Sequence, residues 1–561
     1  MTQAFQDAAS GRAGTRRSAL CGDPDRPLAD ACFCLTLDHG ALRSQAEAAL
    51  PTPGLAGLVH ERWSHAFAEM PVLLSSAQAE RMARVIAAVH EVAALPTWRE
   101  QALLEAPEIA RHNPRGAKGV FFGYDFHVHG DTAALIEINT NAGGALVNTL
   151  LARAQRACCG WIAQASSRQD PASFEDEIVA MFRAEWEAGS SGRDLRSIAI
   201  VDCEPEKQYL YPEFLLFQHL LRRHGIEAVI ADPSELVYGT DGLRWRDIRI
   251  DLVYNRLTDF YLEDAASAAL RAAYLADAVM LTPHPQAHAL LADKRRLVWL
   301  SNDANLQSMG VPKDTRERLL AAVPRTVPVT EADASQLWAE RRRLFFKPVA
   351  GFGGRAAYRG DKITRTVWNS ILAGGYVAQA LVEPGRRAVG VGADAMKFDV
   401  RNFVYDGRVQ WVAARLYHGQ TTNFRTAGGG FAPVYTLPDR LPQASGCEYA
   451  SYVFLLDEAG TIRPIPHALY VALARGEAAS PQLAGRKVRV ADWYVRLRDG
   501  EPNAVVNEWY GWARFADDGR FDPAYHGPGH AGDGRSGNVD ETALPSELER
   551  RQMMEILGRK E

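Results

Sequence analysis

The residues best suited to holding a cation lie in one short stretch, YDFHVHGDTAALIEINTNAGG. Asp125 stands near its start, and Glu137 and Asn139 follow across a turn. Glu137 and Asn139 are two residues apart, so both side chains point to the same face of a strand. Two carboxylates and an amide oxygen are hard ligands that suit Mg²⁺, and burying two acids without a cation would be costly. We predict a magnesium site here; a hairpin with incidental acids is the alternative.

A lysine followed by a glycine-rich loop, FFKPVAGFGGR, is a candidate for binding phosphate. An apolar strand ends at Lys347, and Gly351, Gly353 and Gly354 follow. Glycines allow backbone N–H groups to approach phosphate oxygens closely, and a lysine adds a point charge. The stretch lacks the GxxxxGK[ST] pattern of a Walker A loop, so a plain turn after a core strand is the alternative. Lys294, earlier in the chain, is by itself an ordinary surface lysine on a helix.

Three arginines accompany a second glycine run. DVRNFV and RVQWVAAR predict a hairpin around an Asp-Gly turn, with Asp399 and Arg401 on one face and Arg415 at the end of the second strand. Arg425 precedes the run from Gly428 to Gly430. Arginines that converge beside a flexible loop suit a polyanion, whereas exposed strand arginines are the alternative. Both glycine loops are candidate lids, which we predict to be mobile until a nucleotide orders them.

The strand in GGYVAQALVEPG is a candidate hinge. Gln379 and Leu381 lie at its end, where backbone amide groups could meet an adenine edge. For this stretch alone, a plain core strand is the simpler interpretation. Gln379 and Leu381 are therefore assigned to nucleotide binding only in combination with the other motifs.

The elements between these motifs predict a parallel sheet. SIAIVD, YPEFLLFQHLLRRHG and EAVIAD form a strand–helix–strand unit over residues 196–232, which is half of a Rossmann-like domain. A further strand ends at Asn255 and Arg256. Ligands of such sheets gather beyond the carboxyl ends of the strands, so we predict that Arg256 pairs with a substrate carboxylate. A structural salt bridge, for example to Asp259, is the alternative. Asn141 begins the turn that follows the metal motif.

Composition excludes several classes of protein. The chain has 561 residues, of which 47% are hydrophobic and 23% charged, and a net charge of −5. These values are typical of globular proteins and give no hint of a surface for nucleic acid. No apolar stretch is long enough to span a membrane, and the first residues lack the apolar segment of a signal peptide. Seven cysteines without CxxC spacing predict reduced thiols and a cytoplasmic protein.

Taken together, the motifs resemble the ATP-grasp superfamily over roughly residues 120–436. DVRNFV…AAR…NFRTAGGG resembles the ligases that add glutamate to ribosomal proteins, and DF…IEINTNAGG resembles the metal-binding end of D-alanine–D-alanine ligases. The EIN motif comes last in most ATP-grasp enzymes, but here it precedes both lysines. This order is similar to that of eukaryotic-type glutathione synthetase, a circularly permuted member. The metal-binding glutamate that follows the lysine in that family is absent near Gly351, and Asp125 would replace it.

The resemblance implies an α/β (α+β) chain with a circularly permuted ATP-grasp fold, an inserted Rossmann-like substrate domain and an N-terminal helical region. The predicted organisation is a disordered tail at 1–27, a helical region at 28–115, a permuted segment with the metal motif at 116–190, the substrate domain at 195–290, the nucleotide-binding domain with its lid loops at 291–440, and a strand-rich extension and tail at 441–561.

The resemblance also assigns roles to the candidate residues. ATP would be bound by Lys294, Lys347, Gly351, Gly353, Gly354, Gln379 and Leu381, and Mg²⁺ by Asp125, Glu137 and Asn139. Arg415, with Arg425 or Arg401, would stabilise charge during catalysis, and Arg256, Asn255 and Asn141 would contact substrate.

The predicted activity is an ATP-dependent carboxylate–amine ligase that acts through an acyl phosphate and releases ADP and phosphate. Its substrates would be small molecules, or the amine could be a peptide end; the oligomeric state is left open. The alternatives are a small-molecule kinase of the same fold and a non-catalytic nucleotide-binding scaffold. Phosphate release that depends on an added amine would separate the ligase from the kinase.

Overall fold

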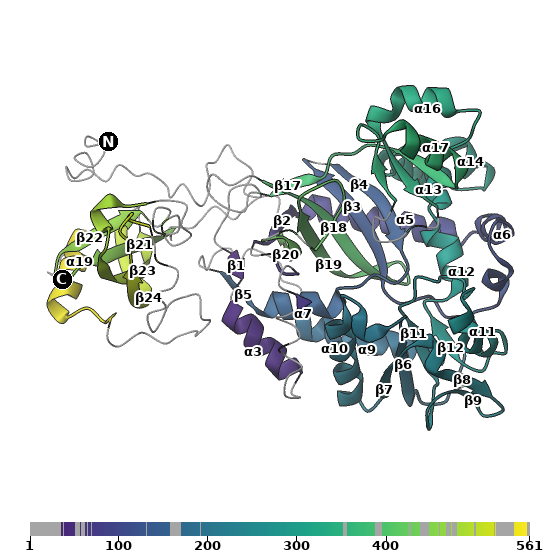
Figure 1. Ribbon diagram of the computed structural model, residues 1–561, viewed down its shortest axis with the longest axis horizontal. Coiled ribbons are helices and arrows are strands. Elements are labelled where there is room, and N and C mark those ends of the chain that lie inside the picture. Colours follow the sequence, from purple (N-terminus) through teal and green to yellow (C-terminus); the bar gives the residue numbers. More distant parts are fainter. Residues whose placement is uncertain are drawn as a thin grey trace.

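The computed structural model describes residues 35–37, 39–50, 57, 62–63, 66–68, 70–130, 132–157, 170–190, 192–349, 351, 356–387, 395–424, 426, 428–437, 448–458, 460–466, 470, 473, 479–498, 501–520, 522 and 543–557. The predicted tail at 1–27, Gly353, Gly354, Arg425 and six of the seven cysteines lie outside these residues; Cys203 is a free thiol. Figure 1 shows the elements. Within the described residues, no helix is both long and apolar enough to cross a bilayer.

The central sheet joins segments that are far apart in the sequence. Its strands run in the order β2-β20-β19-β18-β3-β4, and β17 also pairs with β18. Their bounds are β2 Val72–Ser75, β3 Phe122–His129, β4 Thr132–Asn139, β17 Gly385–Arg387, β18 Met396–Tyr405, β19 Arg408–Tyr417 and β20 Gly430–Leu437. Because β3 pairs antiparallel with both β4 and β18, the hairpin with the metal motif and the hairpin with the arginines form one continuous surface.

The two faces of this sheet differ because side chains alternate along each strand. Phe398, Val400 and Val404 belong to a core that includes residues of α5 (Ser76–Ala93). Phe403 and Trp411 belong to the core on the other face, which α7 and α9 help to form. Asp399, Arg401 and Arg415 share this second face, so it is apolar at one end and charged at the other. The charged end is the candidate site.

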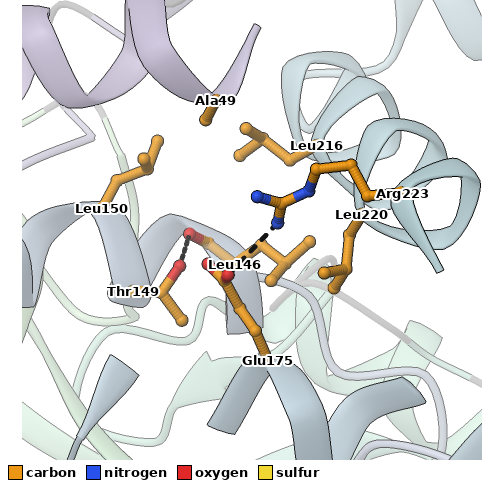
Figure 2. Close-up of a pocket in the computed structure, with 8 residues that line it drawn as sticks. All are labelled: Ala49, Leu146, Thr149, Leu150, Glu175, Leu216, Leu220 and Arg223. Atoms are coloured by element: carbon orange, nitrogen blue, oxygen red, sulfur yellow. Dashed lines mark hydrogen bonds and ion pairs between the residues drawn. The ribbon is translucent and has the colours of Figure 1, made fainter. Parts of the chain in front are cut away.

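Two helices contact strands of the second face, and a third packs against the first of them. They are α7 (Ala145–Arg153), α9 (Pro171–Glu187) and α10 (Tyr211–Arg223). A small pocket opens where α7 and α10 meet α3 (His39–Ala49), and its lining is mostly aliphatic, with Glu175 bonded to Arg223 (Figure 2). None of the residues predicted for the site lines this pocket.

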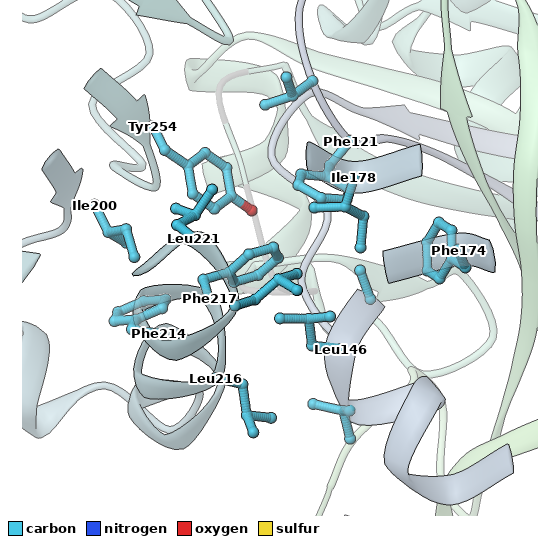
Figure 3. Close-up of a cluster of buried hydrophobic side chains, with 14 of the residues drawn as sticks. Phe121, Leu146, Phe174, Ile178, Ile200, Phe214, Leu216, Phe217, Leu221 and Tyr254 are labelled. Atoms are coloured by element: carbon cyan, nitrogen blue, oxygen red, sulfur yellow. The ribbon is translucent and has the colours of Figure 1, made fainter. Parts of the chain in front are cut away.

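The Rossmann-like unit has the predicted architecture. Its parallel sheet has the order β12-β11-β6-β7, with bounds β6 Ser197–Val201, β7 Glu227–Ala231, β11 Leu252–Asn255 and β12 Met280–Thr282. α10 connects β6 to the parallel strand β7, as the strand–helix–strand pattern predicted. Tyr254 and Ile200 pack against Phe217 and Phe121 in the same core as α7 and α9 (Figure 3). The parallel sheet β12-β11-β6-β7 and the central sheet therefore share a hydrophobic core.

A smaller sheet delivers Lys347. Its order is β13-β16-β14-β15, with bounds β13 Thr326–Pro328, β14 Leu344–Pro348, β15 Tyr358–Arg359 and β16 Tyr376–Ala380. The helices of this region are α12 Pro285–Ala287, α13 Arg295–Leu300, α14 Asp303–Ser308, α15 Lys313–Ala322, α16 Ala334–Glu340 and α17 Arg365–Ala373. Lys294 is the residue directly before α13 and follows a π-helical turn, His288–Ala292.

The remaining strands and α-helices lie outside the three sheets described above. They are β1 Leu35–Leu37, α6 Pro96–Leu104, β5 Gln155–Ala157, β8 Leu236–Gly239, β9 Gly242–Trp245, β10 Ile248–Arg249, α11 Ala268–Leu275, β21 Glu448–Leu456, β22 Ile462–Pro466, β23 Lys487–Arg498, β24 Glu501–Arg514 and α19 Glu547–Ile556. The region at 28–115 was expected to be helical, but it also supplies β2, an edge strand of the central sheet. The strand-rich extension is a separate four-stranded sheet, β22-β21-β23-β24.

Candidate functional site

A row of charged side chains crosses the central sheet. The register places Glu137 opposite Asp125, and Asp125 opposite Arg401 on the next strand. One strand further, Asp399 lies opposite Arg415. Residues directly opposite each other in antiparallel strands project to the same face. The hairpin spacing seen in the sequence thus brings the predicted acids and arginines onto one surface.

Asp125 is held by both arginines. Arg401 donates Nε to Oδ1 at 2.7 Å and Nη2 to Oδ2 at 2.6 Å, and Arg415 donates Nη2 to Oδ2 at 2.9 Å. Asn139 donates Nδ2 to the same Oδ2 at 3.2 Å. Burial alone would raise the pKa of Asp125, but the two guanidinium groups outweigh it and hold the pKa at about 2.

The predicted metal ligand Asp125 is thus the counter-ion of two arginines. Three of the four N–H groups are directed at Oδ2 and one at Oδ1. The buried carboxylate, 3% exposed, anchors the arginines. Its role as a ligand of Mg²⁺ stays a prediction.

Glu137 and Asn139 remain as the predicted cation pair. Asn139 Nδ2 donates to Glu137 Oε1 at 3.3 Å, so the two side chains lie together. Burial would raise the pKa of Glu137, but Lys294 and Lys347 outweigh it and lower that pKa. Glu137 Oε2 makes no hydrogen bond within the described residues, so it could ligate a cation carried by an anionic substrate. Among those residues, no three His, Cys, Asp or Glu side chains form a cluster that would hold a metal without such a substrate.

Lys347 is fixed from two sides. Its Nζ donates to the carbonyl oxygen of Ile136 and to Gln379 Oε1, both at 2.8 Å. The carbonyl is accessible because the β3–β4 register skips Ile136, which forms a bulge next to Glu137. Gln379 Nε2 also donates to Ile136, at 3.3 Å, so the glutamine holds the lysine in place. Gln379 is thus a hydrogen-bond partner of Lys347.

Lys294 and Leu381 are two further residues that were predicted to bind the nucleotide. Lys294 Nζ donates to the carbonyl oxygen of Gly351 at 2.5 Å, which brings the second lysine to the glycine loop. The amide of Leu381 donates to the carbonyl oxygen of Arg343 at 2.8 Å. This N–H is therefore already hydrogen-bonded, and the assignment of Leu381 to nucleotide binding stays a prediction.

The charge of Lys347 should make nucleotide affinity depend on pH. Burial lowers the pKa of Lys347 to about 8, so the free chain loses this charge as the pH rises through that value. Bound phosphates would favour the protonated lysine and raise its pKa. We therefore expect ATP to bind roughly eightfold more weakly at pH 9 than at pH 7.5, as followed by titration calorimetry.

The control is Lys347→Met, which should bind ATP more weakly at both pH values but with little slope between them. Equal affinity of the unmodified chain at the two pH values would contradict a titrating lysine in the nucleotide site.

Arg256, which is predicted to pair with a substrate carboxylate, is buried. Most of its side-chain N–H groups make no hydrogen bond within the described residues. Nη1 donates to the carbonyl oxygen of Asn141 at 2.7 Å and to the Tyr254 hydroxyl at 3.2 Å. Nε is buried without a partner, and Nη2 has no hydrogen bond within the described residues. Asp259, the alternative partner, accepts from the backbone amides of Glu263 and Asp264 instead. Arg256 and Asp259 therefore do not form the salt bridge that was the alternative to a contact with substrate.

Asn141 and Asn255 support this region. Asn141 Nδ2 donates to the carbonyl oxygens of Arg256 and Leu257, at 3.1 and 2.8 Å. Asn255 Nδ2 donates to the carbonyl oxygen of Pro283, and its Oδ1 accepts from the amide of Leu257. Both side chains bond to backbone and so position the strand end, and their contact with substrate stays a prediction.

One carboxylate at this place was not predicted from the sequence. Glu213, on α10, accepts from the amides of Gly144 and Leu146 at the start of α7, at 2.9 and 3.2 Å. It caps a helix from which it is 67 residues away. No short-range pattern signals such a cap, because capping residues are normally sought just before the helix.

The chain is similar to solved structures at low sequence identity. No family model matches the chain, and no curated protein matches it. Three similar solved structures are a glutathione synthetase-like effector from Globodera pallida in its apo form (11% identity, 71% of this chain and 97% of that one, TM-score 0.43), a protein assigned as gamma-glutamylcysteine synthetase from Methylobacillus flagellatus (13%, 63% and 86%, 0.37), and the ATP-grasp ligase PsnB complexed with a minimal precursor (17%, 43% and 76%, 0.26).

Proposed function

We propose that the chain is an ATP-dependent ligase that joins a carboxylate to an amine. The observation that carries the proposal is a pair of cationic sites on either side of the 141–144 segment. Ala142 and Arg401 both lie beside Gly123, since a Cβ at Gly123 would be 2.6 Å from Ala142 Cβ and 3.1 Å from Arg401 Nε. Arg256 lies against Gly143, the residue after Ala142, since a Cβ at Gly143 would be 2.7 Å from its Nη2.

The first cationic site suits a triphosphate. Four cations, Lys294, Lys347, Arg401 and Arg415, surround three carboxylates, which leaves a net positive charge. The lysines, Gly351 and, outside the described residues, Gly353 and Gly354 would hold phosphate oxygens. Glu137 and Asn139 would hold Mg²⁺ together with those oxygens, and the ion would neutralise charge on the transferred phosphate.

The second cationic site suits a carboxylate. Arg256 has unused N–H groups in a fork that matches two carboxylate oxygens. The acids Glu213 and Asp202 interact electrostatically with Arg256 but make no hydrogen bond or ion pair with it, so a bound carboxylate would still find unused N–H groups. The narrow space at Gly143, where a Cβ would also lie 2.3 Å from Leu210 Cδ1, keeps that segment close to the arginine.

The proposed reaction has two steps. A carboxylate oxygen of the acid attacks the γ-phosphorus of ATP, the bond to the β-phosphate oxygen breaks, and ADP leaves. The amine nitrogen then attacks the carbonyl carbon of the acyl phosphate, the carbon–oxygen bond to phosphate breaks, phosphate leaves and the amine proton passes to solvent. Arg415 and Arg401 would stabilise the negative charge in both steps because their donors are already oriented by Asp125. Arg425, predicted as a third catalytic arginine, lies outside the described residues.

A substrate screen tests the proposal. ADP release by the full chain would be measured with MgATP, a panel of amino acids and other small carboxylates, and a panel of amines that includes polyamines and short peptides. Release that requires both an acid and an amine supports the ligase. Release that requires only one compound, with that compound phosphorylated, would replace the ligase by a kinase, and binding of ATP without any turnover would favour the scaffold.

Arg256 should control the affinity for the acid. Arg256→Ala should raise the KM for the acid found in the screen by about 10- to 100-fold and change the KM for ATP little, because charge-assisted hydrogen bonds of this type contribute about 1.5–3 kcal/mol. Arg249→Ala, an exposed arginine of the same unit, is the matched control and should leave both values unchanged. An unchanged KM for the acid in Arg256→Ala would make the arginine structural.

A further inference from the structure

The loop at residues 418–424, between β19 and β20, is tied to the arginine row by one hydroxyl. Thr422 Oγ1 donates to Asp399 Oδ2 in a short hydrogen bond. The neighbouring loop residue Asn423 donates Nδ2 to the carbonyl oxygen of His418 at 2.8 Å, which closes the loop on itself. The hydroxyl of Thr421 makes no hydrogen bond within the described residues. Thr422 is therefore the side chain that connects this loop to the site.

Asp399 in turn orients Arg415. Its Oδ1 accepts from Arg415 Nε at 2.8 Å and its Oδ2 accepts from Nη2 at 3.0 Å. Asp125 also accepts from Nη2, so both acids that hold Arg415 contact this nitrogen. Nη1 makes no hydrogen bond within the described residues, so the pairing leaves this nitrogen to face a ligand. The orientation of Nη1 depends on where the Asp399 carboxylate lies.

The same loop reaches the substrate side through an aromatic stack. Phe424 lies over Tyr209 with ring centroids 5.4 Å apart and an interplanar angle of 17°. It also contacts Phe431 of β20 at 4.6 Å. Tyr209 precedes Leu210, whose side chain lies beside Gly143 and Arg256. Thr422 thus contacts the first cationic site, and Phe424 contacts Tyr209, the neighbour in sequence of Leu210 at the second.

We propose that Thr422 and Asp399 are positioning residues that couple the docking of the 418–424 loop to the orientation of Arg415. When Phe424 rests on Tyr209, the Thr422 hydroxyl reaches Asp399 and fixes the carboxylate that aligns the arginine. When the loop is displaced, Asp399 loses this donor and Arg415 is held less firmly. The inference rests on the proposed function, because it assumes that Arg415 acts on the transferred phosphate.

The test compares threonine variants by the kinetics of ADP release. Thr422→Val removes the hydroxyl and keeps the shape, so we expect kcat to fall by about 10- to 30-fold while the KM for ATP stays within about twofold, as is usual for residues that orient a catalytic group. Thr422→Ser restores the donor and should recover kcat to within about threefold. Thr421→Val is the matched control and should match the unmodified chain.

Hydrogen exchange of the full chain without nucleotide provides a second measurement that needs no substrate. Thr422→Val should increase exchange in peptides that cover 416–424 and 205–215, whereas Thr421→Val should not. Equal exchange in both variants, or a kcat of Thr422→Val equal to that of Thr421→Val, would overturn the coupling. If the unmodified chain releases no ADP with any acid and amine, the proposed function fails, and the exchange comparison still decides whether Thr422 holds the loop.

Discussion

Asp125→Asn is expected to destabilise the protein by about 3–5 kcal/mol, the usual cost of removing one partner from a buried ion pair. The carboxylate neutralises Arg401 and Arg415, which are themselves 8% and 9% exposed. An asparagine of the same shape could keep a hydrogen bond, but two buried guanidinium groups would lose their shared counter-charge. Thermal unfolding should show a midpoint lower by about 5 °C or more.

The matched control is Asp303→Asn. Asp303 accepts from Arg316 Nε at 2.7 Å, which is the same type of pair, but its side chain is 54% exposed. Exposed pairs contribute about 0–1 kcal/mol, so this variant should unfold close to the unmodified chain. Equal midpoints for the two variants would mean that desolvation of Asp125 cancels its pairing with the arginines.

The same prediction has a pH signature. The pKa of Asp125 is lowered to about 2 in the folded chain, so its contribution to stability is present above the ordinary aspartate pKa and is lost as the pH falls toward that value. The difference in midpoint between the unmodified chain and Asp125→Asn should therefore narrow between about pH 4 and pH 2.

The sequence predicted those parts of the site that depend on local pattern. The turn at Asp406-Gly407 and the alternation in DVRNFV placed Asp399 and Arg401 on one face, and the hairpin pairs Asp399 with Arg415 as the spacing implies. Glu137 and Asn139 share a face for the same reason. Period-2 alternation and Asp-Gly turns act over a few residues, so one sequence is enough to recognise them.

The partners of these residues could not be predicted, because they come from strand pairing over long separations. Asp125 was assigned to a metal on its residue type, yet the pairing of β3 with β18 places Arg401, 276 residues later, directly opposite it. A carboxylate suits both a cation and a guanidinium, and only the register of the two strands decides between them. The contact of Lys347 with the Ile136 carbonyl and the cap that Glu213 provides for α7 also join segments that are far apart in the sequence.

The role of Gln379 shows how burial changes a local interpretation. A glutamine in an alternating strand resembles a polar residue at a strand end, but here it is 2% exposed and lies between Lys347 and Thr326. Its side chain supplies the acceptor that a buried ammonium needs when no ligand is bound. The strand β16 therefore contributes Gln379 to the part of the site that contains Lys347. The amide of Leu381, next to this strand, donates to the carbonyl oxygen of Arg343.

Glu137→Gln should reduce ADP formation by at least about 100-fold while leaving the fold intact. The glutamine keeps the size of the side chain and an oxygen for Asn139, so the hairpin should be unchanged. It removes the negative charge beside Lys294 and Lys347, and with it the carboxylate that would hold Mg²⁺ against the phosphates. Activity should be measured with the acid and amine from the screen over a range of Mg²⁺ concentrations.

The dependence on Mg²⁺ separates a ligand from a structural acid. If Glu137 holds the cation, Glu137→Gln should need a higher Mg²⁺ concentration for half-maximal activity, and its unfolding midpoint should stay within a few degrees of the unmodified chain. Glu317→Gln, a surface acid of α15 that is 66% exposed, is the control and should change neither value. A Glu137→Gln variant with full activity, or one with reduced activity and an unchanged Mg²⁺ requirement, would remove Glu137 from the cation site.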